Sequence, residues 1–567
     1  MQIRQLSTRA LIIILLTSVV WGQHPDAVGR RGMVVSGNEV ASRIGLNILR
    51  RGGNAIDAAI ATGFALAVVQ PRAGNIGGGG FMVLRLADGQ TTTLDFREKA
   101  PGRATRNMYV SEQGEVIENA STEGILASGV PGTVSGFGLA FERYGSGRMT
   151  WSDLLTPAIE LAGQGFAVTY QLHNDLVVRE EKLTRFEETK RIFYPNGEPL
   201  RLNALFKQPE LAATLTRISA QGSREFYVGE TARLLAEHMH RRRGMITMDD
   251  LAAYETVERP PVEFTYRDVR IISMGPPSSG GIILAQILNL LELGDLSKIE
   301  FHSAEHIHSM VEAERRAYAD RFHYLGDVDY VNVPINKLIS KSYAAKRWGD
   351  FSPKWATAST NVKHGDARML VEADETTHYS VADRWGNAVA VTTTINDLYG
   401  SGEVVAGGGY FLNDEMDDFT LQPGQPDEDG IVGSHANAIE PGKRMLSSMT
   451  PTIVTRNDTL LLVLGSPGGK RIITTVAQVV LNVVDFNFSV KAAVEAPRFH
   501  HQWKPDEILA ERLAISPETR TRLARMGHKV RYTEGSIGIV QCIYIDPVSG
   551  WYFGAADSRG ASGAAGY

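Results

Sequence analysis

Cysteine is almost missing from this 567-residue sequence, in which Cys542 is the only one. The chain therefore cannot form a disulfide bond within itself, although an exported protein would tolerate one. An excess of positive charge is missing too, because the formal net charge is −6 and the two signs are interspersed. That balance makes nucleic acid and anionic membrane surfaces poor partners, and it favours a small-molecule or peptide substrate.

Long hydrophobic runs are also scarce. One apolar run, residues 10–20, follows Arg4 and Arg9 near the N-terminus. It is shorter than the roughly 18 apolar residues that a membrane-spanning helix needs. The pattern predicts a signal peptide over residues 1–22 and export to the periplasm or the extracellular space, with no membrane anchor after its removal. Retention of this segment as an anchor is the alternative.

The sequence has the composition of a large globular core, with 43% hydrophobic and 22% charged residues. Apolar residues three and four apart predict helices, and Asn54 is a suitable N-cap for one of them. Alternating apolar residues, with Asp88-Gly89 as a hairpin turn, predict strands. The expected helices are 39–51, 55–70, 136–145, 152–163, 209–220, 281–293, 303–324, 469–484 and 515–526. The expected strands flank 88–89 and fall within 376–396, 408–414, 451–465 and 541–557.

Two glycine-rich stretches resemble nucleotide-binding loops only in part. GSPGGK at 465–470 is one residue too short for a phosphate loop, and Arg471 stands where a Ser or Thr should be. The backbone N–H groups of Gly468 and Gly469 still suit an anionic oxygen, although a tight strand-to-helix turn explains them equally well. GGGG at 77–80 lacks the strand before it and the helix after it that a dinucleotide site requires, so close backbone packing is expected there.

Two further motifs have competing explanations. HSAEH at 302–306 fits an inverted zinc-peptidase pattern, in which His302 and His306 share one helix face and Glu312 or Glu314 completes the site. Solvent-exposed helix histidines are the simpler explanation. PPSSGG at 276–281 could bind an anion at a helix start, but Ser278 or Ser279 acting as an N-cap explains it without a ligand.

The stretch DETTHYSVADRWGNAVAVTTTIN, residues 374–396, predicts a β-hairpin with an unusual number of hydroxyls. Pairing Ala382 with Ala388 across a loop at 383–387 places Thr376 opposite Thr394. Because side chains alternate along a strand, one face is polar and the other is apolar. The polar face carries Thr376, Thr392, Thr394 and Asn396, and the apolar face carries Val389, Val391 and Ile395. A threonine-rich sheet surface is the ordinary alternative.

Nine stretches together resemble the γ-glutamyltranspeptidase family, in the order of that family and from about residue 32 to the C-terminus. They are AGNIGGGGFM (73–82), LDFREKAP (94–101), PPSSGG, the hairpin, NDEMDDF (413–419), KRMLSSMTPTIV (443–454), GSPGGKRI (465–472), PRFHHQW (497–503) and GAADSRG. The resemblance implies an α+β fold, the four-layer αββα sandwich of the N-terminal-nucleophile hydrolases. It implies no cofactor and no metal.

The resemblance also implies that the precursor cuts itself between Glu375 and Thr376. A large subunit, residues 23–375, and a small catalytic subunit, residues 376–567, would then remain together as a heterodimer. Thr376 Oγ would be the nucleophile, and the new α-amino group, with an ordinary pKa near 7.7–8.0, would be its base. The expected activity is hydrolysis of glutathione and similar compounds through a γ-glutamyl-Thr376 ester, which water or an amino acid or peptide acceptor then takes over. The neighbouring Thr377 is the alternative nucleophile.

The family motifs assign the rest of the site. Arg97 suits a bidentate contact with the α-carboxylate of the substrate, to which Ser447 and Ser448 add hydroxyl donors. The α-ammonium group would be held by Asn396, Glu415 and Asp418. The backbone amides of Gly468 and Gly469 would stabilise the oxyanion, and Thr394 would hydrogen-bond the nucleophile.

Two positions depart from the family pattern. Glu415 stands where several bacterial relatives carry Gln, which leaves ammonium binding intact. Asp429 stands before Gly430, where relatives with a covering lid often place Tyr, and this leaves open the balance between hydrolysis and transfer. An acylase for other side chains, a poly-γ-glutamate depolymerase, the zinc peptidase and an uncleaved binding protein are the rival functions.

Overall fold

The computed structural model describes residues 24–363, 376–424 and 434–567. The predicted signal peptide, Glu375, Asp429 and Gly430 lie outside the described residues. Among the described residues, none of the helices combines the length and the apolar character needed to cross a membrane.

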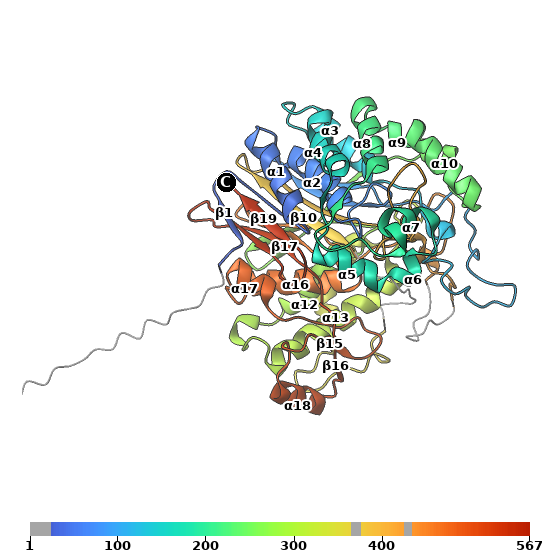
Figure 1. Cartoon of the computed structure of the whole chain (residues 1–567). Coiled ribbons are helices and arrows are strands. Elements are labelled where there is room, and N and C mark those ends of the chain that lie inside the picture. Colours follow the sequence, from blue (N-terminus) through green and yellow to red (C-terminus); the bar gives the residue numbers. More distant parts are fainter. Residues whose placement is uncertain (1–23, 364–375, 425–433) are drawn as a thin grey trace, which may run out of the picture.

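Two seven-stranded sheets form the centre of the molecule (Figure 1). All strand pairs within them are antiparallel. The first sheet has the order β1 (Ala27–Gly29), β18 (Tyr552–Ala556), β17 (Gln541–Ile545), β13 (Thr459–Gly465), β12 (Thr452–Arg456), β9 (Val269–Ser273) and β8 (Val262–Tyr266). The second has the order β19 (Gly563–Gly566), β2 (Gly32–Ser36), β10 (Thr377–Asp383), β11 (Ala388–Thr394), β3 (Gly79–Arg85), β4 (Thr91–Asp95) and β7 (Val257–Arg259).

Helices cover the outer face of each sheet, with one group above and one below in Figure 1. The second sheet is covered by α1 (Glu39–Arg50), α2 (Ala55–Val69), α3 (Thr133–Tyr144), α4 (Trp151–Gln164) and α8 (Pro209–Gln221). The first sheet is covered by α12 (Gly280–Leu291), α13 (Ala304–Tyr324), α16 (Arg471–Val484) and α17 (Val490–Glu495). The four layers confirm the predicted αββα sandwich.

The remaining elements lie around these layers, and most of them are shorter than ten residues. The helices are α5 (Tyr170–Val178), α6 (Glu180–Leu183), α7 (Glu187–Phe193), α9 (Glu225–Val228), α10 (Glu230–Arg242), α11 (Met248–Ala252), α14 (Ile335–Leu338), α15 (Lys341–Arg347) and α18 (Pro517–Met526). Two small sheets consist of β5 (Phe166–Ala167) with β6 (Leu205–Phe206), and of β14 (Phe499–His500), β15 (Ile508–Ala510) and β16 (Val530–Tyr532).

Local sequence signals account for most element boundaries. The Asn54 side chain accepts hydrogen bonds from the first turn of α2, and Asp57 completes a capping box with it. The Asp88-Gly89 turn joins β3 to β4 as predicted. The strand predicted over 408–414 is wrong, because only an isolated bridge between Val404 and Phe411 occurs in that region.

The hairpin of β10 and β11 occupies the middle of the second sheet, between β2 and β3. Its register pairs Ala382 with Ala388 and Thr377 with Thr393, as predicted. Val389 and Val391 join the core under the outer helices, whereas Ala388 packs between the two sheets. Every residue of both strands is buried, so the alternative of an exposed, threonine-rich surface is wrong.

Candidate active site

One small cavity brings together all the predicted catalytic and binding residues except Gly468. Its volume is only about 10 Å³, roughly the space of one water molecule. It is lined by Arg97, Thr376, Thr394, Asn396, Glu415, Asp418, Ser447, Ser448 and Gly469, together with Met449 and Ile472. These residues come from loops and strand ends at one end of the central strands of the second sheet and from the loop before α16.

The two central threonines lie at the ends of the hairpin strands. Thr376 directly precedes β10, and Thr394 is the last residue of β11. Thr394 Oγ1 accepts a hydrogen bond from the backbone N–H of Asn396 at 2.8 Å. Gly78 packs against the same strand end, where an added Cβ would lie 2.1 Å from the Thr394 carbonyl oxygen. The glycine run at 77–80 therefore permits close backbone packing, as predicted.

Thr377 differs from Thr376 in its surroundings. The Thr377 hydroxyl donates to Gln70 Oε1 at 3.0 Å, and Thr377 is not among the residues that line the cavity. Side chains alternate along a strand, so adjacent residues face opposite sides of the sheet. Of the two threonines, therefore, only Thr376 lies against the predicted binding residues.

Arg97 is fully buried and joins the acids of the cavity directly. Its guanidinium pairs with the carboxylates of Glu415 and Asp418. It also donates to the carbonyl oxygens of Met445 at 3.3 Å and Leu446 at 3.2 Å. In this structure the predicted carboxylate-binding arginine therefore pairs with the two acids that are predicted to bind the ammonium group.

Hydrogen bonds to two buried side chains outside the cavity hold the loops that carry these charges. Asn437 Nδ2 donates to the Asp418 carbonyl oxygen at 2.6 Å, and Asn437 Oδ1 accepts from the Leu446 N–H at 2.8 Å. Asn437 is fully buried, so it links the acidic segment to the segment that leads into Ser447. The Arg97 backbone N–H is held in turn by Asp95 Oδ1 at 3.0 Å.

Glu98 is a buried acid next to Arg97 for which the sequence analysis gave no role. Burial raises the pKa of Glu98 to about 7, against the lowering effect of the Arg97 guanidinium. Arg97 Nη1 lies 3.6 Å from Glu98 Oε2, and both side chains are inaccessible to solvent. The LDFREKAP motif contains Glu98, but sequence alone gives no sign that its carboxyl is buried.

The turn between β13 and α16 carries Gly468 and Gly469, whose N–H groups were predicted to bind the oxyanion. Gly468 and Gly469 have φ values of +129° and +52°, which only glycine adopts readily. Their carbonyl oxygens accept from the N–H groups of Arg471 and Ile472 at 3.0 Å. The strand-to-helix turn was predicted, and Gly469 lines the cavity from this side.

The PPSSGG loop contacts the serine pair of the site, and of its two serines only Ser278 caps α12, because the Ser278 hydroxyl accepts the Gly280 N–H at 3.0 Å. Ser279 is in the N-cap position, but its hydroxyl makes no capping bond and donates to the Ser447 carbonyl oxygen at 2.7 Å. Ser278 Oγ donates to the Met449 carbonyl oxygen at 2.6 Å. The contact between this loop and the serine pair could not be predicted from the sequence, because the two segments are about 170 residues apart.

The geometry does not support a zinc site at His302 and His306. His306 Nδ1 accepts the His302 backbone N–H at 3.0 Å, and Glu312 binds Arg315 and Arg316. His306 is buried and His302 half-buried, and desolvation lowers the pKa of His306 to about 3 and that of His302 to about 4. In the part of the chain that the structure describes, the one cluster with metal-ligand spacing is a different set, His308, Glu312 and His528.

That second cluster is satisfied by protein contacts. His308 Nδ1 lies 2.8 Å from His528 Nε2, and His308 Nε2 lies 2.7 Å from the Ser352 carbonyl oxygen. Glu312, its only acid, also binds the Thr357 hydroxyl besides the two arginines. A metal ion would have to displace all these contacts.

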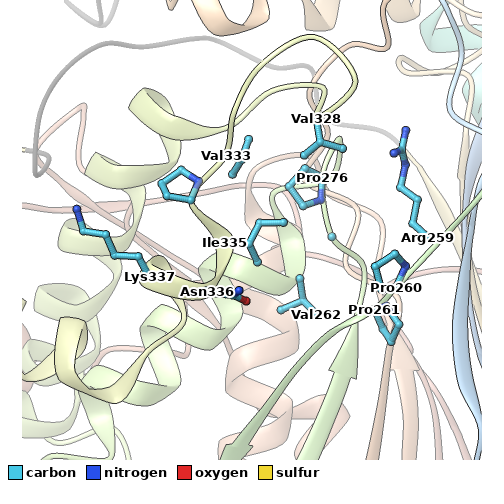
Figure 2. Close-up of a pocket in the computed structure, with 12 residues that line it drawn as sticks. Arg259, Pro260, Pro261, Val262, Pro276, Val328, Val333, Ile335, Asn336 and Lys337 are labelled. Carbon is cyan, nitrogen blue, oxygen red and sulfur yellow. The ribbon is translucent and has the colours of Figure 1, made fainter.

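A larger cavity of about 620 Å³ lies elsewhere and shares no residue with the cavity of Thr376. Figure 2 shows Arg259 and Lys337 at opposite sides of it, with prolines and Val262 between them. No Ser, Thr, Cys, Asp or Glu is among its lining residues, so it has no hydroxyl or thiol nucleophile and no carboxylate. It does not fit hydrolytic chemistry.

Comparison with known proteins gives a consistent result. A model of the gamma-glutamyltranspeptidase family matches residues 41–567. The glutathione hydrolase proenzyme of Escherichia coli (strain K12) is 47% identical over 537 residues, which cover 94% of this chain and 91% of that protein. A cephalosporin acylase from Bacillus halodurans superimposes with a TM-score of 0.85 at 26% identity, covering 98% of this chain and 99% of that one. A gamma-glutamyltranspeptidase structure from Helicobacter pylori has a TM-score of 0.57 at 46% identity and covers 57% of this chain and 93% of its own.

Proposed function

The chain belongs to the γ-glutamyltranspeptidase family, and on this premise we propose that Thr376 is the nucleophile of a self-processing γ-glutamyltransferase and glutathione hydrolase. The observation that carries the proposal is the single cavity in which Thr376 meets Arg97, Glu415, Asp418 and the glycine turn. Cleavage between Glu375 and Thr376 gives a large subunit, residues 23–375, and a small one, residues 376–567.

The reaction follows from the groups present. Thr376 Oγ attacks the γ-carbonyl carbon of the substrate, and the α-amino group of Thr376 takes the hydroxyl proton. The backbone N–H groups of Gly468 and Gly469 stabilise the tetrahedral oxyanion. The amide nitrogen leaves with the proton returned by the ammonium group, and a γ-glutamyl ester of Thr376 remains. Water or the amine of an amino acid or dipeptide then cleaves the ester.

The charge pairs of the site favour a zwitterionic substrate. Glu415 and Asp418 pair with Arg97 in this structure. When the substrate binds, its α-carboxylate pairs with Arg97 instead, and its α-ammonium group pairs with Glu415 and Asp418. A substrate without the ammonium group would leave buried carboxylates without a counter-charge, which is costly. This favours γ-glutamyl compounds over the side chains that a simple acylase removes.

The experiment compares Thr376→Ala with Thr377→Ala, a matched neighbour whose hydroxyl binds Gln70. Thr376→Ala should remain one full-length chain on a denaturing gel and should not hydrolyse γ-glutamyl-p-nitroanilide. Thr377→Ala should still be cut, and sequencing of its small chain should start at Thr376. Cleavage in the Thr376→Ala variant, or a wild-type small chain starting at residue 377, would refute the assignment.

Two further properties are proposed on sequence grounds. Residues 1–22 are a signal peptide that exports the chain to the periplasm or the outside. The substrate pair is glutathione with an amino acid or dipeptide acceptor. N-terminal sequencing of the large chain from culture supernatant and periplasm tests the first point, and product analysis with and without glycylglycine tests the second.

A further inference from the structure

Arg321 is a buried residue outside the cavity that contacts one of its serines. It lies in the last turn of α13, and its side chain is inaccessible to solvent. Its guanidinium donates from Nε to Ser279 Oγ and from Nη2 to Ser448 Oγ, both at 2.8 Å. Ser448 lines the cavity with Thr376 and Arg97. Arg321 therefore acts on the site through a serine that faces it.

The contact fixes the role of the Ser448 hydroxyl. A guanidinium has donors only, so Ser448 Oγ must be the acceptor of this bond. A serine hydroxyl has one proton, which must then be offered in a direction away from Arg321. A carboxylate only accepts hydrogen bonds, and it is the partner that a hydroxyl held in this orientation suits.

Ser279 strengthens the same arrangement from the other side. Its backbone N–H and its hydroxyl both donate to the Ser447 carbonyl oxygen at 2.7 Å. The Ser447 N–H in turn donates to the Pro277 carbonyl oxygen at 2.9 Å. The serine segment thus has its backbone held by the PPSSGG loop and one of its side chains held by Arg321.

We propose that Arg321, braced by Ser279, is a positioning residue that turns the Ser448 hydroxyl into a donor toward the α-carboxylate of the substrate. The inference rests on the proposed function and assigns it one further determinant, selectivity for acyl groups that carry an α-carboxylate. A hydroxyl held in its donating orientation loses no rotational freedom when the substrate binds. Without Arg321, the same hydroxyl must be reoriented at each binding event.

The test compares two amides that differ only in this carboxylate. The probes are γ-glutamyl-p-nitroanilide and 4-aminobutyryl-p-nitroanilide, which retains the ammonium group. KM is measured for the first, and the inhibition constant of the second against it reports binding whether or not the second is hydrolysed. Arg321→Met should raise KM for the γ-glutamyl amide about tenfold with a smaller change in kcat, which is the effect of one lost charge-assisted hydrogen bond. Binding of the 4-aminobutyryl amide should be nearly unchanged.

Arg316→Met is the matched control, because Arg316 is a buried arginine of the same helix that binds Glu312 and Asp350 outside the site. It should leave the ratio of the two binding constants unchanged. Arg321→Lys, which retains a donor, should restore part of the selectivity. In a Ser448→Ala background, Arg321→Met should have little further effect on the ratio, because the hydroxyl that it orients is gone.

Three results would overturn the inference. The ratio could be unchanged in Arg321→Met, both amides could be weakened equally, or the effect could persist in full in Ser448→Ala. Where Arg321→Met does not accumulate as folded protein, Ser279→Ala replaces it, and the same loss of selectivity is expected. Wild type that fails to hydrolyse γ-glutamyl-p-nitroanilide would contradict the proposed function itself, whereas an active wild type with an unchanged ratio contradicts the inference alone.

Discussion

Replacing Glu98 with Gln should make the stability of the protein less dependent on pH. The structure raises the pKa of this buried carboxyl from 4.5 to about 7, with burial as the largest cause. The folded state therefore retains a proton that the unfolded chain releases, so stability is complete below about pH 4.5 and is lost as the pH rises through about 7. At about 1.4 kcal/mol for each pKa unit, the loss amounts to about 3 kcal/mol.

Urea unfolding at about pH 4 and about pH 8.5 measures this loss. The variants are made on a Thr376→Ala background, so that one uncut chain unfolds. The free energy of unfolding of Glu98→Gln minus that of its parent should increase by about 3 kcal/mol from the lower to the higher pH, because only the parent loses stability. Glu98→Met should show the same change with pH, although its packing shifts both values by a constant amount. A difference between variant and parent that is the same at both pH values would refute the reasoning.

Two other predictions concern the oxyanion turn and the histidine motif. Gly468→Ala should lower kcat by about 10²- to 10³-fold, because it strains a donor turn with φ of +129°; Gly89→Ala, at φ of +90° in an exposed hairpin turn, should leave kcat unchanged. Dialysis against EDTA should leave hydrolysis of γ-glutamyl-p-nitroanilide intact, since His302 and His306 belong to no cluster with metal-ligand spacing among the described residues. Normal kcat in Gly468→Ala, or loss of activity with EDTA that zinc restores, would contradict these expectations.

The hairpin shows how far sequence reasoning reaches. Pairing Ala382 with Ala388 follows from alternation and loop length, and the observed register agrees. Burial of its polar face could not be derived in the same way, because it depends on the first sheet packing over it. A strand of small residues such as Ala388 and Ala390 was compatible with either surface or interior.

The active site, like the hairpin, could be predicted from the sequence only in part. Family motifs brought Arg97, Asp418 and Ser448 to attention, and the structure places them in one cavity. They gave no sign that Arg97 pairs with the acids of the site, since that depends on distances between segments over 300 residues apart. Arg321 was missed because it lies in a regular helix, where an arginine is usually a solvated charge.

The order of strands has a consequence for how the mature enzyme would fail. With the bond before Thr376 cut, β10, β11 and β19 belong to one chain, while β2, β3, β4 and β7 of the same sheet belong to the other. The other large sheet also contains strands of both chains. In it β12, β13, β17 and β18 of one chain are flanked by β1, β8 and β9 of the other. The two chains cannot separate on dilution unless the hydrogen bonds between their strands break in both sheets. Each disrupted sheet then exposes unpaired strand edges, which favour aggregation. The lifetime of the cut enzyme is therefore set by an unfolding rate and not by an association constant, and its thermal loss should be independent of protein concentration and irreversible.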